Sequence, residues 1–146
     1  MTNVLMVAAE AAPFAKVGGM ADVVGSLPAA LKQVGIDARV LLPGYGMIPH
    51  YKYNIQWQFS FEFHHNHGTS QVTVFSTVYE GVTFYFFQAW PYFGGESSVY
   101  HDYGWDLPRF VFMNQVAMAV IWQLRVRYGW QADVVHTHDW HSGLLP

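Results

Sequence analysis

The sequence predicts an α/β fold in which a parallel sheet carries an inserted antiparallel hairpin or meander. Two short runs rich in Val and Leu, at residues 4–9 and 38–42, flank a segment whose apolar residues recur at helical spacing. Such runs are typical of strands buried on both faces, and a strand, a helix and a strand in succession form a unit with parallel strands. Residues 56–64 instead alternate strictly between polar and apolar, which is typical of a sheet with one face in water.

The first helix is expected over residues 20–34, after a loop that follows the first strand. Pro28 interrupts this segment. Because a proline has no N–H to donate within a helix, we expect either a kink there or a restart with Ser26 as the N-cap. Gly35 is expected to cap the C-terminus of the helix, and the second strand follows at residues 38–42.

The middle of the chain predicts three strands that pair with one another in antiparallel fashion. Two further strand candidates, residues 71–78 and 82–89, follow the alternating run and are joined around Glu80 and Gly81. Together with residues 56–64 they form the hairpin or meander inserted in the α/β frame.

A long helix and a third strand are predicted for the last part of the chain. The helix covers residues 107–126, with Pro108 in its first turn, where proline is tolerated, and Gly129 after its end. Residues 133–138 then predict a short strand that is buried.

Composition limits the classes of function. The chain has 146 residues, of which 52% are apolar, 18% aromatic and 12% charged, so we expect a folded chain and not a disordered one. The formal net charge of -3 gives no electrostatic basis for binding nucleic acid.

No window approaches the ~20 consecutive apolar residues of a membrane span. The absence of cysteine excludes disulfides and thiolate metal sites. No basic leader precedes the first apolar run, so we expect no signal or transit peptide and a cytoplasmic location.

A glycine-rich loop between the first strand and the first helix is one candidate site. It contains Lys16, Gly18, Gly19 and Asp22. Adjacent glycines let a backbone approach a ligand closely, a helix N-terminus presents free N–H groups to an anion, and a lysine adds a positive charge for a phosphate. The spacing fits neither the P-loop nor the dinucleotide-binding fingerprint. From the residues alone, phosphate binding and a tight turn with a solvated lysine both remain open.

A histidine-rich segment follows the last predicted strand. His136, His138, Asp139 and His141 lie at its carboxyl end. Ligands of open α/β sheets bind beyond the carboxyl ends of the strands, so these residues and the glycine-rich loop are predicted at the same edge. A metal site is the rival interpretation. Because His136 and His138 would point to one face of the strand while His141 lies beyond it, we expect no metal site.

Two further polar segments are weaker candidates. Residues 64–67, with the sequence His-His-Asn-His, have a composition that can bind metal, but their place between an alternating strand and Gly68 favours an exposed hairpin turn. Residues 97–105 are rich in aromatic and hydrogen-bonding side chains, which suits both sugar recognition and an ordinary surface loop.

Several blocks of the sequence resemble a known family. Residues 10–28 resemble the opening of bacterial glycogen synthases and plant starch synthases, whose signature Lys-x-Gly-Gly-Leu-x-Asp-Val appears here as Lys-Val-Gly-Gly-Met-Ala-Asp-Val. Residues 41–45, residues 100–102 followed by Arg109, and residues 136–144 resemble further blocks in the family's order. The methionine replaces the usual leucine, and the spacing before Arg109 differs from that of the family.

The resemblance implies a Rossmann-like N-terminal half of a GT-B glycosyltransferase. Such an enzyme is a retaining hexosyltransferase that moves glucose from ADP-glucose to the non-reducing end of an α-1,4-glucan, with no metal ion or other cofactor. By this similarity, Lys16 and the backbone of Gly18 and Gly19 would contact the phosphates of the donor, and Asp22 would lie in the same cleft. A lysine and a helix N-terminus can stabilise the charge of a leaving diphosphate.

The same resemblance implies a sugar region made by residues from two segments. Asp139 and His141 are the catalytic residues that it implies, and Tyr100 would line the glucose and acceptor region with them.

Length is the main difference from the family. Its members carry a second Rossmann-like domain that holds most nucleotide contacts, and nothing in these 146 residues resembles it. We therefore expect residues 1–146 to form an incomplete N-terminal domain that lacks the C-terminal nucleotide-binding domain and is inactive, or nearly so, alone. One alternative is a non-catalytic relative that binds α-glucan or a full-length synthase. Another is a GT-B transferase with a different nucleotide sugar, because these residues do not distinguish ADP from UDP. The excess of apolar and aromatic surface also predicts self-association.

Overall fold

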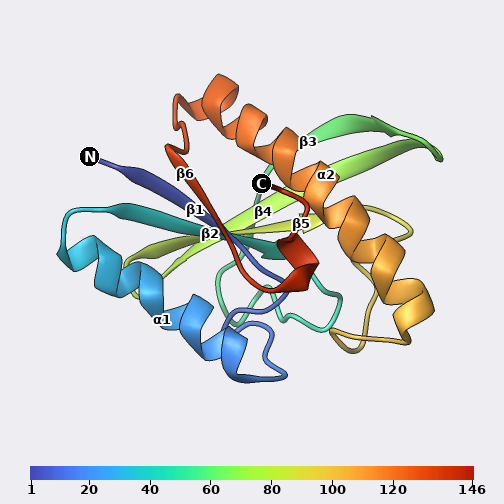
Figure 1. Cartoon of the computed structure of the whole chain (residues 1–146), viewed down its shortest axis with the longest axis horizontal. Coiled ribbons are helices and arrows are strands. Elements are labelled where there is room, and N and C mark those ends of the chain that lie inside the picture. The colour runs from blue at the N-terminus through green and yellow to red at the C-terminus, as the bar shows by residue number, and fades with distance from the viewer.

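The predicted α/β fold is confirmed in a computed structural model that describes residues 1–146. The strands are β1 (Asn3–Val7), β2 (Asp37–Pro43), β3 (Gln56–His65), β4 (Gly68–Tyr79), β5 (Val82–Gln88) and β6 (Val134–Thr137), and the helices are α1 (Gly19–Gln33) and α2 (Tyr103–Tyr128). The strands form one sheet in the order β3-β4-β5-β2-β1-β6. Strands β5, β2, β1 and β6 are parallel, whereas β3, β4 and β5 pair antiparallel. Figure 1 shows α1 and α2 on opposite sides of this sheet.

Strands β1 and β2 with helix α1 form the predicted βαβ unit, and β1 is buried on both faces. The predicted restart at Ser26 is wrong, because α1 is one continuous helix with Pro28 buried inside it. The alternative, a kink at Pro28, stays a prediction. Ser26 does not cap a helix, since its hydroxyl donates to the carbonyl of Asp22 at 2.7 Å. Burial of the proline ring offsets the hydrogen bond that the helix loses at this position. Gly35, with a φ of 84°, follows the C-cap and ends the helix as predicted.

The antiparallel insertion is confirmed as a meander of β3, β4 and β5. Glu80 and Gly81 join β4 to β5 with φ values of 49° and 78°, and two positive φ angles in succession make a type I′ hairpin turn. Strands β3 and β4 meet at the pair of His65 and Gly68, which leaves residues 66–67 as the turn. The predicted hairpin turn of the histidine run is therefore confirmed.

Helix α2 begins earlier than predicted. Asp102 caps it by accepting the N–H of Trp105 at 3.1 Å, so Pro108 lies inside the helix and not in its first turn. Gly129, with a φ of 66°, ends α2 as predicted. Neither α1 nor α2 combines the length and the apolar character that crossing a membrane requires.

Strand β6 is confirmed, but the prediction that it is buried is wrong. It pairs only with β1 and forms an edge of the sheet, where no element of this chain covers its outer side. Val134 is 47% exposed and Val135 is 38% exposed as a result.

The two faces of β5 show how the segments around the carboxyl edge are anchored. Phe86 contacts Phe14 of the loop after β1, with ring centroids 5.0 Å apart. On the other face, Phe87 contacts Phe93, which packs on Phe110 of α2 at 5.7 Å. Phe14 therefore fixes the loop that leads to α1, while α2 covers the opposite face.

Candidate active site at the carboxyl edge of the sheet

Parallel pairing of β1 and β6 brings the two predicted site segments together (Figure 1). Val7 at the end of β1 pairs with Thr137 at the end of β6, and the N–H of His138 donates to the carbonyl of Val7 at 3.2 Å. Residues 8–18 leave this edge toward α1, and residues 138–142 form a turn beside them. The prediction of one shared edge is confirmed.

Glu10 is a buried carboxylate between these segments, with 4% of its surface exposed. Its Oε1 accepts the N–H of Val17 at 2.6 Å and the N–H of Gly18 at 3.0 Å. Its Oε2 accepts a short hydrogen bond from the hydroxyl of Tyr100. Lysines and arginines form ion pairs with other carboxylates and none with Glu10. Backbone N–H groups and one hydroxyl thus satisfy a carboxylate that would otherwise be costly to bury.

The structure places Lys16 and Asp22 in contact at the start of α1. The Nζ atom of Lys16 lies 2.8 Å from Oδ1 of Asp22, and both side chains are more than half exposed. An exposed ion pair contributes about 0–1 kcal/mol, so a phosphate can compete with Asp22 for the ammonium. Lys16 is therefore held near the helix N-terminus while remaining available to a ligand.

Gly18 and Gly19 leave the N-terminus of α1 open. Gly18 is the N-cap, with a φ of -141° and a ψ of -166°, an extended conformation that any residue adopts. A Cβ atom added at either glycine would meet nothing within 4 Å. Neither backbone conformation nor crowding within this chain requires glycine at these positions. Their effect is to leave room for a ligand at backbone N–H groups that favour an anion.

Asp139 is held in a strained conformation at the turn after β6. Its φ is 63°, in the left-handed region that costs a non-glycine residue about 1–3 kcal/mol. Its Oδ1 accepts the N–H of Trp140 at 2.7 Å. Strained residues cluster at ligand sites, which agrees with the predicted place of Asp139 in the sugar region.

His141 lies beneath Tyr100, with ring centroids 5.3 Å apart in a stacked arrangement. Burial lowers the pKa of His141, and the opposing effect of Asp139 and Glu10 is smaller, so the imidazole is neutral near pH 7. Its Nδ1 atom is buried without a hydrogen-bond partner. Burial and the hydrogen bond to Glu10 raise the pKa of Tyr100, which keeps its hydroxyl protonated. The site thus presents neutral rings between Glu10 and Asp139.

Sequence reasoning missed three residues that build this site. Glu10 could have been found, because it is a charged residue that directly follows a buried strand. Asn114 is a polar residue within an apolar helix, and its side chain donates to the carbonyl of His141 at 2.8 Å. Ser142 is buried, accepts the N–H of His138 at 2.8 Å and donates to its carbonyl at 3.0 Å, which closes the turn. No local pattern indicates this role of Ser142.

One buried and two partly buried histidines predict a fold that acid destabilises. Burial lowers the folded-state pKa of His50, His138 and His141 below the ordinary value of about 6.5. The unfolded chain therefore binds more protons below about pH 7, so the stability present above that pH is lost as the pH falls toward the folded-state pKa values. We expect urea denaturation to give a lower free energy of unfolding at about pH 5.5 than at about pH 7.5. His141→Gln should reduce this difference, and equal stability at the two pH values would contradict the prediction.

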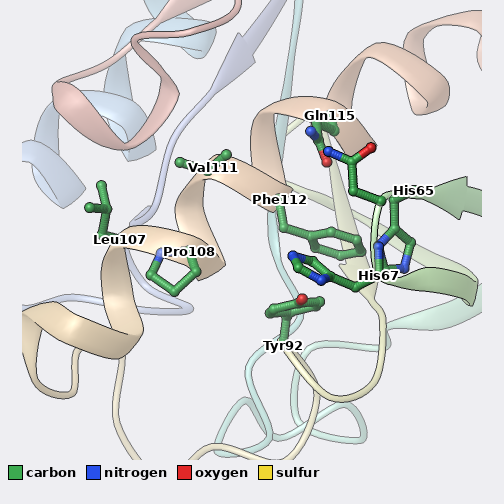
Figure 2. A pocket seen from close by; sticks show the side chains of 9 residues that line it. His65, His67, Tyr92, Leu107, Pro108, Val111, Phe112 and Gln115 are labelled. Carbon is green, nitrogen blue, oxygen red and sulfur yellow. The ribbon is translucent and has the colours of Figure 1, made fainter.

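The hairpin histidines line a separate pocket between the β3–β4 turn and α2 (Figure 2). Its volume is about 340 Å³. The ring of His65 packs on Phe112 with centroids 5.2 Å apart, and Figure 2 shows His67 beside the rings of Phe112 and Tyr92. Tyr92 is sandwiched between Phe112 at 4.3 Å and Trp105 at 5.5 Å, so neither face of its ring is free to stack on a sugar. Nowhere in residues 1–146 do three or more His, Asp or Glu side chains form a group that could hold a metal ion.

The parallel part of the sheet, with an open helix N-terminus and polar side chains at its carboxyl edge, defines a Rossmann-like fold, in which ligands bind at that edge. The chain belongs to the family of the starch synthase catalytic domain, which matches residues 3–146. The predicted family resemblance is thereby confirmed.

Individual relatives agree with this assignment. The chain is 38% identical over 150 residues to a glycogen synthase of Lachnospira eligens, covering 100% of this chain and 30% of that protein. It is 40% identical over 146 residues to a glycogen synthase of Exiguobacterium sibiricum, covering 99% of this chain and 29% of that protein. The chain thus spans about 30% of the length of these curated relatives.

A solved structure shows the same fold. It is the catalytic domain of starch synthase IV from Arabidopsis thaliana, bound to ADP and acarbose, and it matches with a TM-score of 0.82 and 25% identity. The match covers 99% of this chain and 29% of the Arabidopsis chain.

Proposed function

We propose that this chain supplies part of the active site of a glycogen or starch synthase of the GT-B type, which transfers glucose with retention from ADP-glucose to the non-reducing end of an α-1,4-glucan. One observation carries the proposal: Lys16 and the open N-terminus of α1 lie at the same sheet edge as Tyr100, Asp139 and His141. A cationic site for a diphosphate beside neutral rings and carboxylates suits a nucleotide sugar. Similarity to glycogen synthases supports the proposal.

The phosphate side of the site would stabilise the leaving group. Negative charge grows on the diphosphate as its bond to glucose breaks. The ammonium of Lys16 supplies positive charge for it, and the N–H of Gly19, at the first position of α1, can donate to a phosphate oxygen. Asp22 holds Lys16 in place while the site is empty. No cofactor is needed for this part of the reaction.

The sugar side would recognise hydroxyl groups. The exposed carboxylate of Asp139 accepts hydrogen bonds from them, and the buried, neutral imidazole of His141 supports the ring of Tyr100. Tyr100, whose hydroxyl already donates to Glu10, presents a flat ring. These groups suit a neutral hexose, which hydrogen-bonds through many hydroxyls.

A second Rossmann-like domain would supply the remaining nucleotide contacts and the preference for ADP, in a cytoplasmic enzyme. Exposed apolar side chains on α2 and the unpaired edge of β6 support this part of the proposal. Met118, Trp122 and Val126 lie on one side of α2 at 59%, 59% and 62% exposure, and the outer edge of β6 is unpaired. Apolar surface of this kind is typical of faces that another part of a protein covers, or through which isolated chains associate.

A chimaera tests the function directly. In it, this chain replaces the matching segment of the Exiguobacterium sibiricum glycogen synthase, and we expect glucose transfer from ADP-glucose to glycogen. Lys16→Ala in the chimaera should raise the KM for ADP-glucose about tenfold, because a direct charge on the phosphate is lost. Lys52→Ala removes an exposed lysine that contacts only the ring of Tyr53 and is the control. An unchanged KM in Lys16→Ala would contradict the phosphate role, and appreciable turnover by the 146-residue chain alone would contradict its expected inactivity.

A non-catalytic module that binds α-glucan is the second candidate. The exposure of three tryptophans favours it: Trp57 at 61%, Trp90 at 81% and Trp122 at 59%. Exposed indole rings can stack on sugars. Affinity of the 146-residue chain for glycogen, together with a chimaera that transfers no glucose, would favour this module over the synthase.

A further inference from the structure

Glu10 connects the two halves of the candidate site, which are the backbone before α1 and the aromatic pair of Tyr100 and His141. We propose that Glu10 is a positioning residue, whose carboxylate holds the start of α1 and the ring pair of Tyr100 and His141 in one fixed arrangement. The inference rests on the proposed function, since it assigns Glu10 a part in the same glucosyl transfer.

The first half of the connection is the backbone before α1. Val17 and Gly18 donate their N–H groups to Oε1 of Glu10 at 2.6 Å and 3.0 Å. Because these two groups are already used, the N–H groups that α1 offers to a phosphate begin at Gly19 and Met20, which have no acceptor within the helix. Glu10 thus determines which donors face the ligand and in which direction they point.

The second half is the aromatic pair on the sugar side. The hydroxyl of Tyr100 donates to Oε2 of Glu10, the other oxygen of the same carboxylate. The ring of Tyr100 stacks on His141, and the ring of Phe110 meets His141 edge-on at 4.8 Å. Asn114 fixes the carbonyl of His141. Asn114 thus holds the backbone of His141, and Phe110 packs against one side of its ring. The orientation of the ring then depends on Tyr100, which Glu10 holds in place.

The burial of Glu10 indicates that this connection is rigid. Its side chain is almost fully buried, and each of its oxygens has a donor from a different segment of the chain. Moving either segment would strand a charged oxygen in the interior, which is costly. A carboxylate that two segments share therefore couples their positions, as catalysis requires when a donor phosphate and a sugar must be held at a fixed separation.

Three variants separate the two halves. Glu10→Gln keeps an oxygen that can accept from Val17 and Gly18, but it removes the charge and reverses the bond to Tyr100, whose hydroxyl must then accept from the amide N–H₂. Tyr100→Phe removes the hydroxyl and leaves the carboxylate in place. Tyr51→Phe makes the same change at a fully exposed tyrosine and is the matched control.

Nuclear magnetic resonance of the 146-residue chain is the first test, because it needs no activity. Glu10→Gln should shift the imidazole signals of His141, and Tyr100→Phe should shift the amide signals of Val17 and Gly18, whereas Tyr51→Phe should change neither. Unmoved His141 signals in folded Glu10→Gln would overturn the proposal. If Glu10→Gln does not fold, unmoved Val17 and Gly18 amides in Tyr100→Phe would overturn it equally.

Kinetics of the chimaera form the second test. Glu10→Gln should lower kcat about tenfold while the KM for ADP-glucose stays within about threefold. The Val17 and Gly18 N–H groups keep an oxygen acceptor, whereas the charge-assisted bond to Tyr100 becomes a weaker, reversed bond. A kcat equal to that of the unsubstituted chimaera would contradict the positioning role. An unsubstituted chimaera that transfers no glucose would instead count against the proposed function, and the coupling between Tyr100 and the Val17–Gly18 amides would still be decided by the spectra.

Discussion

Replacing Arg109 by methionine is expected to lower the free energy of unfolding by about 3–5 kcal/mol, the usual effect of removing one partner from a buried ion pair. Arg109 is fully buried, and its guanidinium contacts Asp106 at 2.7 Å and Glu96 at 3.1 Å. Both carboxylates are themselves more than 90% buried. Methionine fills much of the volume of the arginine but leaves two carboxylates without their cation, and the large effect comes from those stranded charges.

The loss of Arg109 should also disturb the loop between Tyr92 and Val99, which leads to Tyr100. Arg109 also donates to the carbonyls of Tyr92 at 3.1 Å and Val99 at 3.2 Å, so one side chain of α2 fixes both ends of that loop. Arg109→Lys keeps the charge but has no planar fork to reach several acceptors at once, and it should recover only part of the lost stability. Loss of Tyr100 from its position would follow in either variant.

Urea denaturation of the original chain and of each variant, analysed with a common m-value, measures the difference in the free energy of unfolding. Arg127→Met is the control, because Arg127 is exposed and its hydrogen bonds to Gln123 and Ser60 lie at the surface, where such a change costs less than about 0.5 kcal/mol. A loss below about 1 kcal/mol in Arg109→Met would show that Asp106 and Glu96 find other partners or water.

Local patterns predicted the parts of the fold that depend on neighbours in the sequence. The buried strand β1, the connection at Glu80 and Gly81, and the helix end at Gly129 each follow from a run or a turn of a few residues. The shared carboxyl edge also followed, because parallel strands place their ends together whatever their side chains are.

Other features depend on contacts that no local pattern contains. Helix α1 continues through Pro28 because the proline ring is buried. Strand β6 is exposed because it lies at the edge of the sheet, where no other strand of this chain pairs with its outer side. The role of Glu10 depends on Tyr100, which is 90 positions away in the sequence. The residues that motifs predicted therefore gather at the carboxyl edge of the sheet, whereas the contacts that hold them in place join segments that lie far apart in the sequence.

The second large effect is expected at Gly25, where alanine should destabilise the chain by about 1–3 kcal/mol. This change in stability is opposite in sign to the one that helix propensity alone predicts, since alanine in the interior of a helix is favoured over glycine by about 1 kcal/mol. A Cβ atom at position 25 would lie 2.5 Å from the carbonyl oxygen of Ala12, which is a backbone atom that cannot rotate away. The N–H of Ala12 also donates to the carbonyl of Ala21 at 2.9 Å, so α1 and the loop after β1 are in direct backbone contact.

Relief of this clash requires α1 to move away from the loop, and that movement would reach the site. The N-terminus of α1 is tied to Glu10 through Val17 and Gly18, so a shifted helix stretches those hydrogen bonds. Hydrogen exchange of the Gly18 amide should therefore become faster in Gly25→Ala than the loss of global stability explains. Gly19→Ala is the matched control, because it makes the same change in the same helix where nothing lies within 4 Å of the new Cβ atom. A Gly25→Ala chain as stable as the original would mean that α1 and the loop separate at little cost, and that contact with Ala12 does not set the position of the helix.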